Sequence, residues 1–392
     1  MIAARSQSAT DAPGLPPIKK PVASVTRLTL TEFRCYAHAR VEVGPGAIVL
    51  TGPNGAGKTN LLEAISLLSP GRGLRSARSA DFQRIGADHD AVWGVAATIA
   101  GPDGETLAGT GREPGSERRI IQIDGKPGKS QAALTQIVSV VWLTPHMDRL
   151  FVEGAKSRRR FLDRLTFGFD PAHAGRVTRH DLALRQRARL LAERPGETAW
   201  LDAVEAELAA TGVALAAARV DMVARLARAL DAATGPFPRP IVAAEGPVES
   251  RLMGQPALAV EDWLREVLMR NRNSDSVHGE TQVGAHRGDL AVTHREKNMP
   301  AALTSTGEQK AILVAIILAA ARLATAERGR TPILLLDEVA AHLDETRRQA
   351  LYAEIGALGA QAWMTGTDRS LFETLEGDAQ HFTIRDAHIT HA

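Results

Sequence analysis

The stretch GPNGAGKT at residues 52–59 constrains the fold of this chain more than any other feature of its sequence. It follows the strand-like run AIVLT and precedes the helix-like run NLLEAISLL, which is the strand, loop and helix order of a P-loop. Its glycines let backbone N–H groups turn inward around a phosphate, Lys58 adds a positive charge, and the hydroxyl of Thr59 can bind Mg²⁺. The motif therefore predicts an α/β protein that binds a nucleoside triphosphate. The expected contacts are Gly52, Pro53, Asn54, Gly55, Ala56, Gly57, Lys58, Thr59 and Asn60.

A second apolar run, ILLLDE at residues 333–338, ends in two carboxylates. Such a run is typical of a buried parallel strand, and the carboxyl end of that strand would lie beside the P-loop. We expect Asp337 to hold Mg²⁺ through water, and Glu338 to polarise the attacking water as general base. A strand that leads into an acidic helix start would also carry carboxylates, but it would not predict a partner P-loop. Together the two motifs predict ATP hydrolysis, with Glu338, Lys58 and Asp337 as the catalytic residues.

The periodicity of the chain divides it into a tail and three further segments. Residues 1–24 are rich in Pro, Ser and Ala and lack an apolar h-region, which predicts a disordered tail rather than a signal peptide. Strand-like alternation is common in residues 25–150, helical periodicity dominates residues 151–275, and helices alternate with strands in residues 276–392. We therefore predict an α/β head built from residues 25–150 and 276–392, with a compact helical lobe inserted between its two halves.

Composition limits where such a protein can work. Hydrophobic residues make up 44% of the chain and charged residues 23%, which indicates a soluble globular protein. The single cysteine, Cys35, excludes an internal disulfide and suits a reducing compartment. The longest apolar run, at residues 311–321, is too short and too interrupted to span a bilayer. We expect a cytoplasmic protein with no membrane partner.

A local excess of basic residues stands out in a chain whose net charge is only +2. Residues 156–194 contain eleven Arg or Lys and four Asp or Glu. An excess of this kind attracts the phosphodiester backbone of DNA, so Arg158, Arg159 and Arg160 are candidate DNA contacts. A solvated helix face, or pairing of these arginines with the acidic residues at 193–207, is the alternative interpretation. There is little aromatic interleaving, which favours duplex or junction contact over base stacking.

The polar stretch STGEQ at residues 305–309 is followed at once by Lys310 and the apolar run AILVAIILAAARLATA. Ser305 and Glu308 have the spacing of a capping box, and a helix start can also bind a phosphate. The order of STGEQ, the Asp-Glu strand and an Asp six residues after Glu338 resembles the ABC-type ATPases. In that superfamily the signature contacts ATP bound to a second head, which implies an ATP-dependent homodimer. The residues implied to contact the partner's ATP are Ser305, Gly307, Gln309 and Asp344.

Residues 31–65 narrow the resemblance to the RecF family, through TEFRCYAHARVEVGPGAIVLTGPNGAGKTNLLEAI. The blocks SRRRFLD at residues 157–163 and GAHRGDL at residues 284–290 are also similar to that family. The resemblance implies that Arg34 lies near the nucleotide phosphates in cis, with an exposed strand arginine as the alternative. Thr367 stands where transporter ATPases carry a switch histidine, and a plain strand-end threonine explains it equally well. Some positions depart from the family pattern, since Glu308 replaces a usual Gln, His146 a usual Glu and Ala285 a usual Pro.

The RecF resemblance implies a weak ATP hydrolase that acts as a switch. It implies binding to duplex, gapped or single-stranded junction DNA, support for recombinase loading, replication restart and the SOS response, and RecO and RecR as partners. An ABC transporter subunit would share the P-loop, the signature and the Asp-Glu strand, but it would not need the inserted lobe. Another SMC-like chromosome protein would carry a far longer coiled coil at this point, and an ATPase-coupled nuclease would need an additional acidic metal-binding domain.

Overall fold

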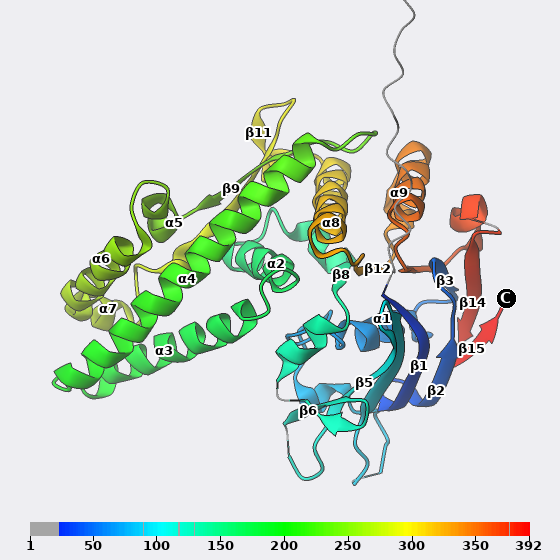
Figure 1. Cartoon of the computed structure of the whole chain (residues 1–392), viewed down its shortest axis with the longest axis horizontal. Helices are drawn as coiled ribbons and strands as arrows, with labels where there is room; N and C mark the ends of the chain where they lie inside the picture. Colours follow the sequence, from blue (N-terminus) through cyan, green and yellow to red (C-terminus); the bar gives the residue numbers. More distant parts are fainter. Residues whose placement is uncertain (1–22, 89, 117, 129, 376) are drawn as a thin grey trace, which may run out of the picture.

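The computed structural model describes residues 23–392 except residues 89, 117, 129 and 376. Residues 1–22 of the predicted tail therefore lie outside the described residues. The predicted end of the tail at residue 24 is corrected, because Ser24 already begins strand β1. Two six-stranded sheets and one three-stranded sheet, with the helices that cover them, make up the described part of the chain. A head of two sheets lies on one side, and a mainly helical lobe projects from it (Figure 1).

The central sheet of the head is assembled from both ends of the chain. Strands β14, β3, β13, β12 and β8 run parallel, and β15 closes one edge in the antiparallel direction. Parallel strands buried on both faces explain the continuous apolar runs that carry no alternation. In spatial order the strands are β15 (His388–His391), β14 (Ala379–Arg385), β3 (Ala47–Thr51), β13 (Ala362–Gly366), β12 (Ile333–Leu336) and β8 (Val140–Leu143).

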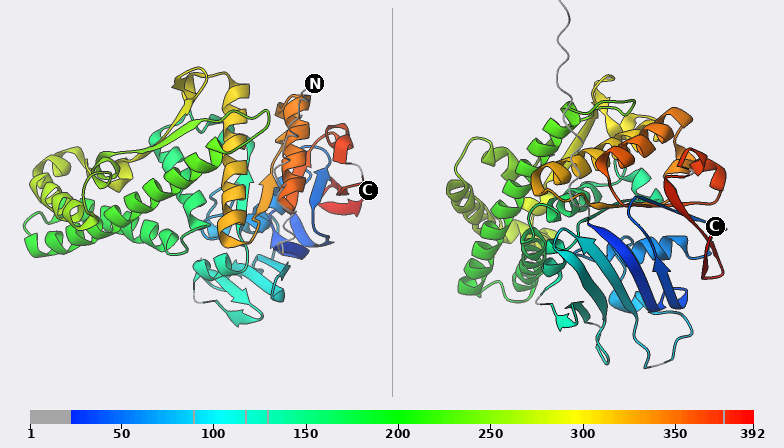
Figure 2. Two further views of the ribbon diagram at one scale, coloured as in Figure 1. Left: turned by 45° about the horizontal axis from the view of Figure 1, so that its top comes forward. Right: turned by 45° about the vertical axis from the view of Figure 1, so that its right-hand side comes forward.

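Three helices pack around this central sheet. Helix α1 (Lys58–Ser66) contacts β13 and β8 and also strand β4 of the second sheet, so it lies between the two sheets. Helices α8 (Thr306–Arg328) and α9 (Glu345–Leu358) pack against each other, and Figure 2 shows them side by side over the central sheet. By length and composition, α8 is the one helix among the described residues that could cross a membrane. The apolar run at residues 311–321 is part of this longer helix of 23 residues, and burial of α8 inside the head explains its apolar sequence.

The second sheet of the head is antiparallel, and its strand β4 packs against α1. It contains β5, which the sequence did not predict, because its residues include three glycines and few apolar side chains. Pairing with β4 and β6 on both sides compensates for that weak intrinsic preference. The strands, in spatial order, are β2 (Tyr36–Glu42), β1 (Ser24–Phe33), β4 (Gly94–Gly101), β5 (Gly104–Arg112), β6 (Arg119–Ile123) and β7 (Lys126–Pro127).

The projecting lobe has its own apolar core and one unexpected strand. Residues 151–275 were expected to be helical, but β9 (Ile241–Glu245) lies among them and pairs with β10 (Asp289–His294), which in turn pairs with β11 (Met299–Pro300). Helix α4 packs on α3 and α6 and also reaches α8 of the head. The lobe helices are α2 (Ala155–Phe167), α3 (His173–Glu193), α4 (Thr198–Asp231), α5 (Pro247–Leu252), α6 (Ala257–Arg270) and α7 (Arg272–His278).

Candidate nucleotide-binding site

The P-loop connects β3 to α1 and takes a conformation that only glycine permits at two positions. Gly52 has φ 146°, and a Cβ there would lie 2.1 Å from the carbonyl oxygen of Ile384. Gly57 has φ 114° at the start of α1, where a Cβ would lie 2.6 Å from the hydroxyl of Tyr36. The two glycines therefore bring the backbone closer to its neighbours than any other residue could. The amino end of α1 is left facing the loop, as an anion site requires.

Lys58 lies across the loop and is buried there. Its ammonium group donates hydrogen bonds to the carbonyl oxygens of Gly52 at 2.6 Å and Pro53 at 2.8 Å. Burial lowers the pKa of Lys58, while the negative charges of Glu338 and Asp337 act in the opposite direction. Both direct acceptors are neutral, so the oxygens of a phosphate would offer this cation stronger hydrogen bonds than it has here. Asn54 and Gly55 are exposed at the turn of the loop, where they leave its mouth open.

Two carboxylates at the end of β12 lie next to the P-loop helix. Oδ1 of Asp337 accepts a hydrogen bond from the hydroxyl of Thr59 at 3.0 Å and another from the hydroxyl of Thr365 at 2.7 Å. Glu338 follows with φ 52°, which turns the chain away from the strand direction. The sequence-predicted metal residues Thr59 and Asp337 are thus brought together, and their oxygens suit a hard cation such as Mg²⁺.

No group of three or more His, Cys, Asp or Glu among the described residues could hold a metal ion. Because Mg²⁺ requires six oxygen ligands, Thr59 and Asp337 fit it only as part of a shell completed by water and nucleotide phosphates. A pocket of about 690 Å³ adjoins this pair. It lies between the head and α2, and its walls include Thr59, Arg75, Thr144, His146, Met147, Ser157, Arg160, Arg164, Asp337 and Glu338.

Arg34 lies beside the P-loop, but its charge is already partnered. Its Nε and Nη2 donate to the two carboxylate oxygens of Glu63 at 2.8 and 2.7 Å, and its Nη1 donates to the carbonyl oxygen of Asp81. Glu63 is fully buried on α1 and also pairs with Arg75 at 3.0 Å. The two arginines compensate the charge of a carboxylate inside the head. A contact between Arg34 and nucleotide phosphates stays a prediction. Asn60 lies one turn before Glu63 and accepts a hydrogen bond from Arg75 at 2.8 Å.

The STGEQ stretch forms the start of α8, and none of its residues lines the pocket. Ser305 and Glu308 form the reciprocal capping box, so the helix-cap interpretation is correct for this conformation. Glu308 also pairs with Lys297 at 2.5 Å, and hydrogen bonds from Lys297 and then Ser305 lower its pKa to about 2. Gly307 is exposed, and a Cβ there would meet nothing within 4 Å. The start of α8 therefore presents a surface that is open at Ser305 and Gly307 in the part of the chain that the structure describes.

Two other residues expected at the dimer seam have different surroundings. The side chain of Gln309 is buried and donates hydrogen bonds to the carbonyl oxygens of Thr304 at 2.9 Å and Ala302 at 3.3 Å. It supports the turn before α8 rather than facing solvent. Asp344 is exposed and caps α9 by accepting a hydrogen bond from the backbone of Arg347 at 2.8 Å.

The three arginines predicted to contact DNA have unequal surroundings on α2. Arg158 pairs with Asp289 of β10 at 2.7 Å, and Arg159 donates to the carbonyl oxygen of Gly288 at 2.6 Å. Both contacts join α2 to the segment that leads into β10. Arg160 is exposed, as is Lys156 one turn earlier. Arg158 is thus paired, but with Asp289 rather than with the acidic residues at 193–207 that the alternative interpretation named, and Arg160 stays accessible.

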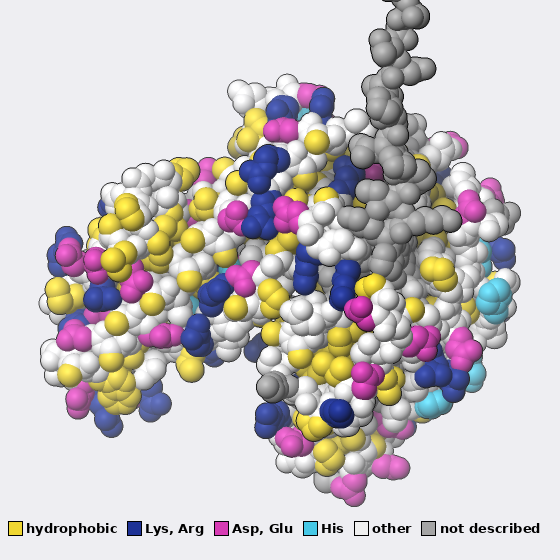
Figure 3. All heavy atoms as spheres, in the orientation of Figure 1, with side chains coloured by type: hydrophobic (Ala, Val, Ile, Leu, Met, Phe, Trp, Pro, Cys, Tyr) yellow, Lys and Arg dark blue, Asp and Glu magenta, His cyan; other side chains and the backbone are white. Residues whose placement is uncertain are grey.

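Acidic residues also neutralise much of the remaining excess on α3. Arg187 is fully buried and pairs with Glu205 at 2.9 Å and with Asp275 at 2.7 Å, and Arg189 pairs with Glu193 at 3.0 Å. In Figure 3 the Lys and Arg side chains of the lobe are interspersed with Asp and Glu on the visible face. Because acidic residues pair with these arginines, the excess of positive charge in residues 156–194 is smaller on the folded surface than in the sequence.

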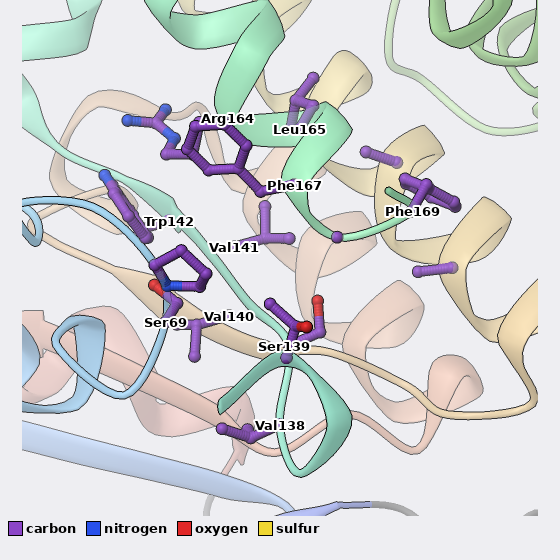
Figure 4. A pocket seen from close by; sticks show the side chains of 15 residues that line it. Ser69, Val138, Ser139, Val140, Val141, Trp142, Arg164, Leu165, Phe167 and Phe169 are labelled. Atoms are coloured by element: carbon purple, nitrogen blue, oxygen red, sulfur yellow. The ribbon is translucent and has the colours of Figure 1, made fainter. Parts of the chain in front are cut away.

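A separate apolar pocket at the junction of α2 and β8 is too small for a nucleotide (Figure 4). It has room for about 20 Å³, enough for about one water molecule. Arg164 lies over the Trp142 ring at 4.4 Å, and burial lowers the pKa of its guanidinium to about 9. These side chains form a packed joint between the lobe and the head.

Comparisons with known proteins identify the family to which this chain is similar. The family described as RecF/RecN/SMC N terminal domain matches residues 24–388. A DNA replication and repair protein RecF from Mesorhizobium japonicum is 48% identical over 364 residues, which cover 92% of this chain and 96% of the relative. The protein of the same name from Brucella suis is 46% identical over 374 residues, covering 94% of this chain and 96% of the relative.

The chain belongs to the RecF family. It is therefore a P-loop ATPase of the RecF/RecN/SMC type, and this membership favours the RecF interpretation over a transporter subunit. A solved structure of the recombination mediator protein RecF-ATPrS has a TM-score of 0.82 at 21% identity and covers 95% of this chain and 99% of its own. An Smc head domain from Pyrococcus furiosus has a TM-score of 0.52 at 16% identity, covering 95% of this chain and 96% of its own. At these identities both likenesses support the α/β ATPase fold alone.

One residue of the site was missed by reasoning from the sequence. Thr367 was singled out at the end of the strand AWMTG, but it is exposed and lies beyond β13. Thr365, two residues earlier, is buried and bonded to Asp337. Both threonines follow apolar strand residues, so only the register between β12 and β13 identifies which one faces the carboxylates. No local signal in the sequence carries that register.

Proposed function

We propose that this RecF-family chain is an ATP-switched DNA-binding protein of recombinational repair and replication restart. ATP joins two heads, the dimer clamps DNA at gaps or junctions, and weak hydrolysis releases it. The observation that carries the proposal is the open start of α8, where Ser305 and Gly307 are exposed and do not line the nucleotide pocket of their own chain. A helix start of this kind can bind a phosphate, and the pocket of the same chain does not include it, so the phosphate would come from a second head.

The residues of the P-loop, of the end of β12 and of the start of α8 have defined roles in this proposal. Lys58 neutralises phosphate charge, and the backbone of residues 52–58 binds phosphate oxygens. Thr59 and Asp337 would hold Mg²⁺, which supplies charge neutralisation at the phosphates when it is bound. Glu338 orients the attacking water and accepts its proton. Ser305, Gly307 and Asp344 contact the nucleotide of the second head, while Gln309 supports the turn that presents them.

DNA as the partner is supported by the names of the relatives, which are DNA replication and repair proteins. A similar solved structure is described as a recombination mediator in the RecFOR pathway. We therefore propose RecO and RecR as partners, support of recombinase loading and the SOS response, and a cytoplasmic location without a membrane partner. On the lobe, Arg160 and Lys156 are the accessible cations of α2, so they replace Arg158 and Arg159 as the proposed backbone contacts.

The dimer is tested by measuring ATP binding, sedimentation and DNA binding together on three variants. Lys58→Ala should lose ATP binding. Gly307→Arg should bind ATP with unchanged affinity and stay monomeric, because the added side chain meets nothing in the monomer but would block a second head. Ser305→Arg should behave in the same way, with some loss of stability from the lost cap, about 1 kcal/mol.

A matched control is Gly356→Arg on the exposed surface of α9, where a Cβ also meets nothing within 4 Å. It should dimerise with ATP as the wild type does. Normal dimerisation of Gly307→Arg would show that the start of α8 is not the seam. Loss of ATP binding in that variant would instead indicate damage to the head.

The DNA contact is tested through salt dependence at saturating ATP, because Arg160 also lines the nucleotide pocket. The double variant Lys156→Ala, Arg160→Ala should reduce the slope of log affinity against log salt by about 1 for each phosphate that the protein no longer neutralises. Arg158→Ala is the control, because it removes a charge that Asp289 already compensates. It should lower the free energy of unfolding and leave the salt slope of DNA binding nearly unchanged. An unchanged slope in the double variant would place the DNA-binding surface elsewhere on the protein.

A further inference from the structure

We propose that Thr365 is a positioning residue that holds both carboxylates at the end of β12 in their working orientations. The inference rests on the proposed roles of Asp337 in Mg²⁺ binding and of Glu338 as general base. It assigns a hydroxyl on a neighbouring strand, rather than the exposed Thr367, to the support of those two residues.

The strand register places Thr365 beside the carboxylates. Strands β12 and β13 are parallel, and their last paired residues are Leu336 and Met364. Thr365 is the next residue along β13, as Asp337 is the next along β12. The side chain of Thr365 is buried, and its residue is only 1% exposed. Thr365 is therefore buried at the carboxyl end of β13, next to the carboxyl end of β12 that carries Asp337 and Glu338.

The hydroxyl of Thr365 has two hydrogen-bond partners, and their chemistry defines which bond it accepts and which it donates. The backbone N–H of Glu338 donates to Oγ1 of Thr365 at 2.9 Å. Because an amide can only donate, the single hydroxyl proton is left for Oδ1 of Asp337, at 2.7 Å. Oδ1 of Asp337 therefore accepts hydrogen bonds from the hydroxyls of both Thr365 and Thr59. With Oδ1 occupied by two hydroxyl donors, Oδ2 is the oxygen of Asp337 that would act towards Mg²⁺.

The same hydroxyl stabilises the turn at Glu338. Glu338 has φ 52°, a left-handed conformation that a residue with a Cβ rarely adopts, and it leaves the strand at this point. Its N–H would otherwise be a partly buried donor without a strand partner. The bond to Thr365 satisfies that donor, and the turn directs the residue to the wall of the nucleotide pocket. Strained backbone at a catalytic residue persists only where neighbours support it.

The test compares Thr365→Val, which keeps the shape and removes the hydroxyl, with Thr365→Ser, which keeps the hydroxyl. In the full chain we expect Thr365→Val to lower kcat for ATP hydrolysis by about tenfold or more and to raise the Mg²⁺ concentration needed for half-maximal rate, as expected for loss of a group that orients a metal ligand. The affinity for ATP, which depends on the P-loop, should change by less than about threefold. Thr365→Ser should restore kcat and the Mg²⁺ dependence.

Thr98→Val is the matched control, because Thr98 is also a buried strand threonine, and its hydroxyl accepts a hydrogen bond from Arg27 at 2.9 Å in the other sheet. It should lower stability without separating kcat from ATP affinity. Thr365→Ala provides the same loss of hydroxyl with a smaller side chain if the valine variant does not fold. Wild-type kcat and Mg²⁺ dependence in the folded valine or alanine variant would refute the inference, as would a serine variant that is no better than valine.

Glu338→Gln separates this inference from the proposed function. It should bind ATP and lose hydrolysis. If Glu338→Gln hydrolyses ATP normally, the proposed role of Glu338 fails whatever the Thr365 variants show. If Glu338→Gln is inactive and the Thr365 variants are normal, the proposed function stands and only the positioning role is wrong.

Discussion

Replacing Asp163 by Asn should lower the free energy of unfolding by about 3 kcal/mol, the low end of the range for breaking a buried ion pair. Asp163 lies on α2 and is only 6% exposed. It accepts hydrogen bonds from Arg219 of α4 at 2.8 and 2.9 Å and from His173 of α3 at 2.8 Å. One carboxylate therefore joins three helices of the lobe. Asn keeps the shape and one acceptor oxygen, but it leaves the buried guanidinium of Arg219 without its main counter-charge.

The pKa of Asp163 gives an independent estimate of the same interaction. Burial by itself would raise this pKa, but the charge of Arg219 and the hydrogen bonds from His173 and Arg219 lower it from 3.8 to about 2. At about 1.4 kcal/mol per pKa unit, the shift corresponds to roughly 2 kcal/mol. Since the folded pKa lies below the unfolded one, this stability is present above pH 4 and is lost as the pH falls from about 4 towards 2.

The assay is urea unfolding followed by circular dichroism at pH 7 and at several values between pH 4 and pH 2. The matched control is Glu193→Gln, which breaks the exposed pair of Arg189 and Glu193, with side chains 76% and 55% exposed. That control should change the free energy of unfolding by less than about 1 kcal/mol. If Asp163→Asn and Glu193→Gln unfold at the same urea concentration, the reasoning about the buried carboxylate is refuted. The reasoning would also be contradicted if Asp163→Asn lost as much free energy of unfolding between pH 4 and pH 2 as the wild type does.

Two further changes test the nucleotide site and the dimer seam. Gly57→Ala should reduce ATP affinity by at least about tenfold, since its Cβ would lie 2.6 Å from the hydroxyl of Tyr36 and 2.8 Å from Sγ of Cys35; equilibrium nucleotide binding measures it, and wild-type affinity would show that the loop can shift. Glu308→Gln should strengthen ATP-dependent dimerisation several-fold, because it removes a negative charge from a proposed phosphate contact while Gln can still serve in the capping box. Sedimentation with ATP checks this, and unchanged dimerisation would mean that Lys297 already neutralises Glu308.

The proximity of the P-loop and the Asp-Glu strand end was predictable, because the chemistry of this candidate site is concentrated in short, contiguous motifs. GPNGAGKT and ILLLDE each specify a local backbone and a set of polar groups, and the parallel sheet brings their ends together. The capping box of Ser305 and Glu308 was predictable for the same reason. In contrast, β5 was missed because its glycines carry little intrinsic preference, and only its two neighbouring strands make it a strand.

What the sequence by itself determined is the kind of chemistry this protein can perform. A P-loop and an Asp-Glu strand end need only local spacing to indicate nucleotide binding and hydrolysis. The tertiary structure decided which side chains are free to take part. Arg158 meets Asp289 across 131 positions of the chain, whereas Arg160 stays exposed, and Thr365 rather than Thr367 faces Asp337. Whether the charge or hydroxyl of a side chain is free to act depends on partners that are distant in sequence, so only the folded structure shows it.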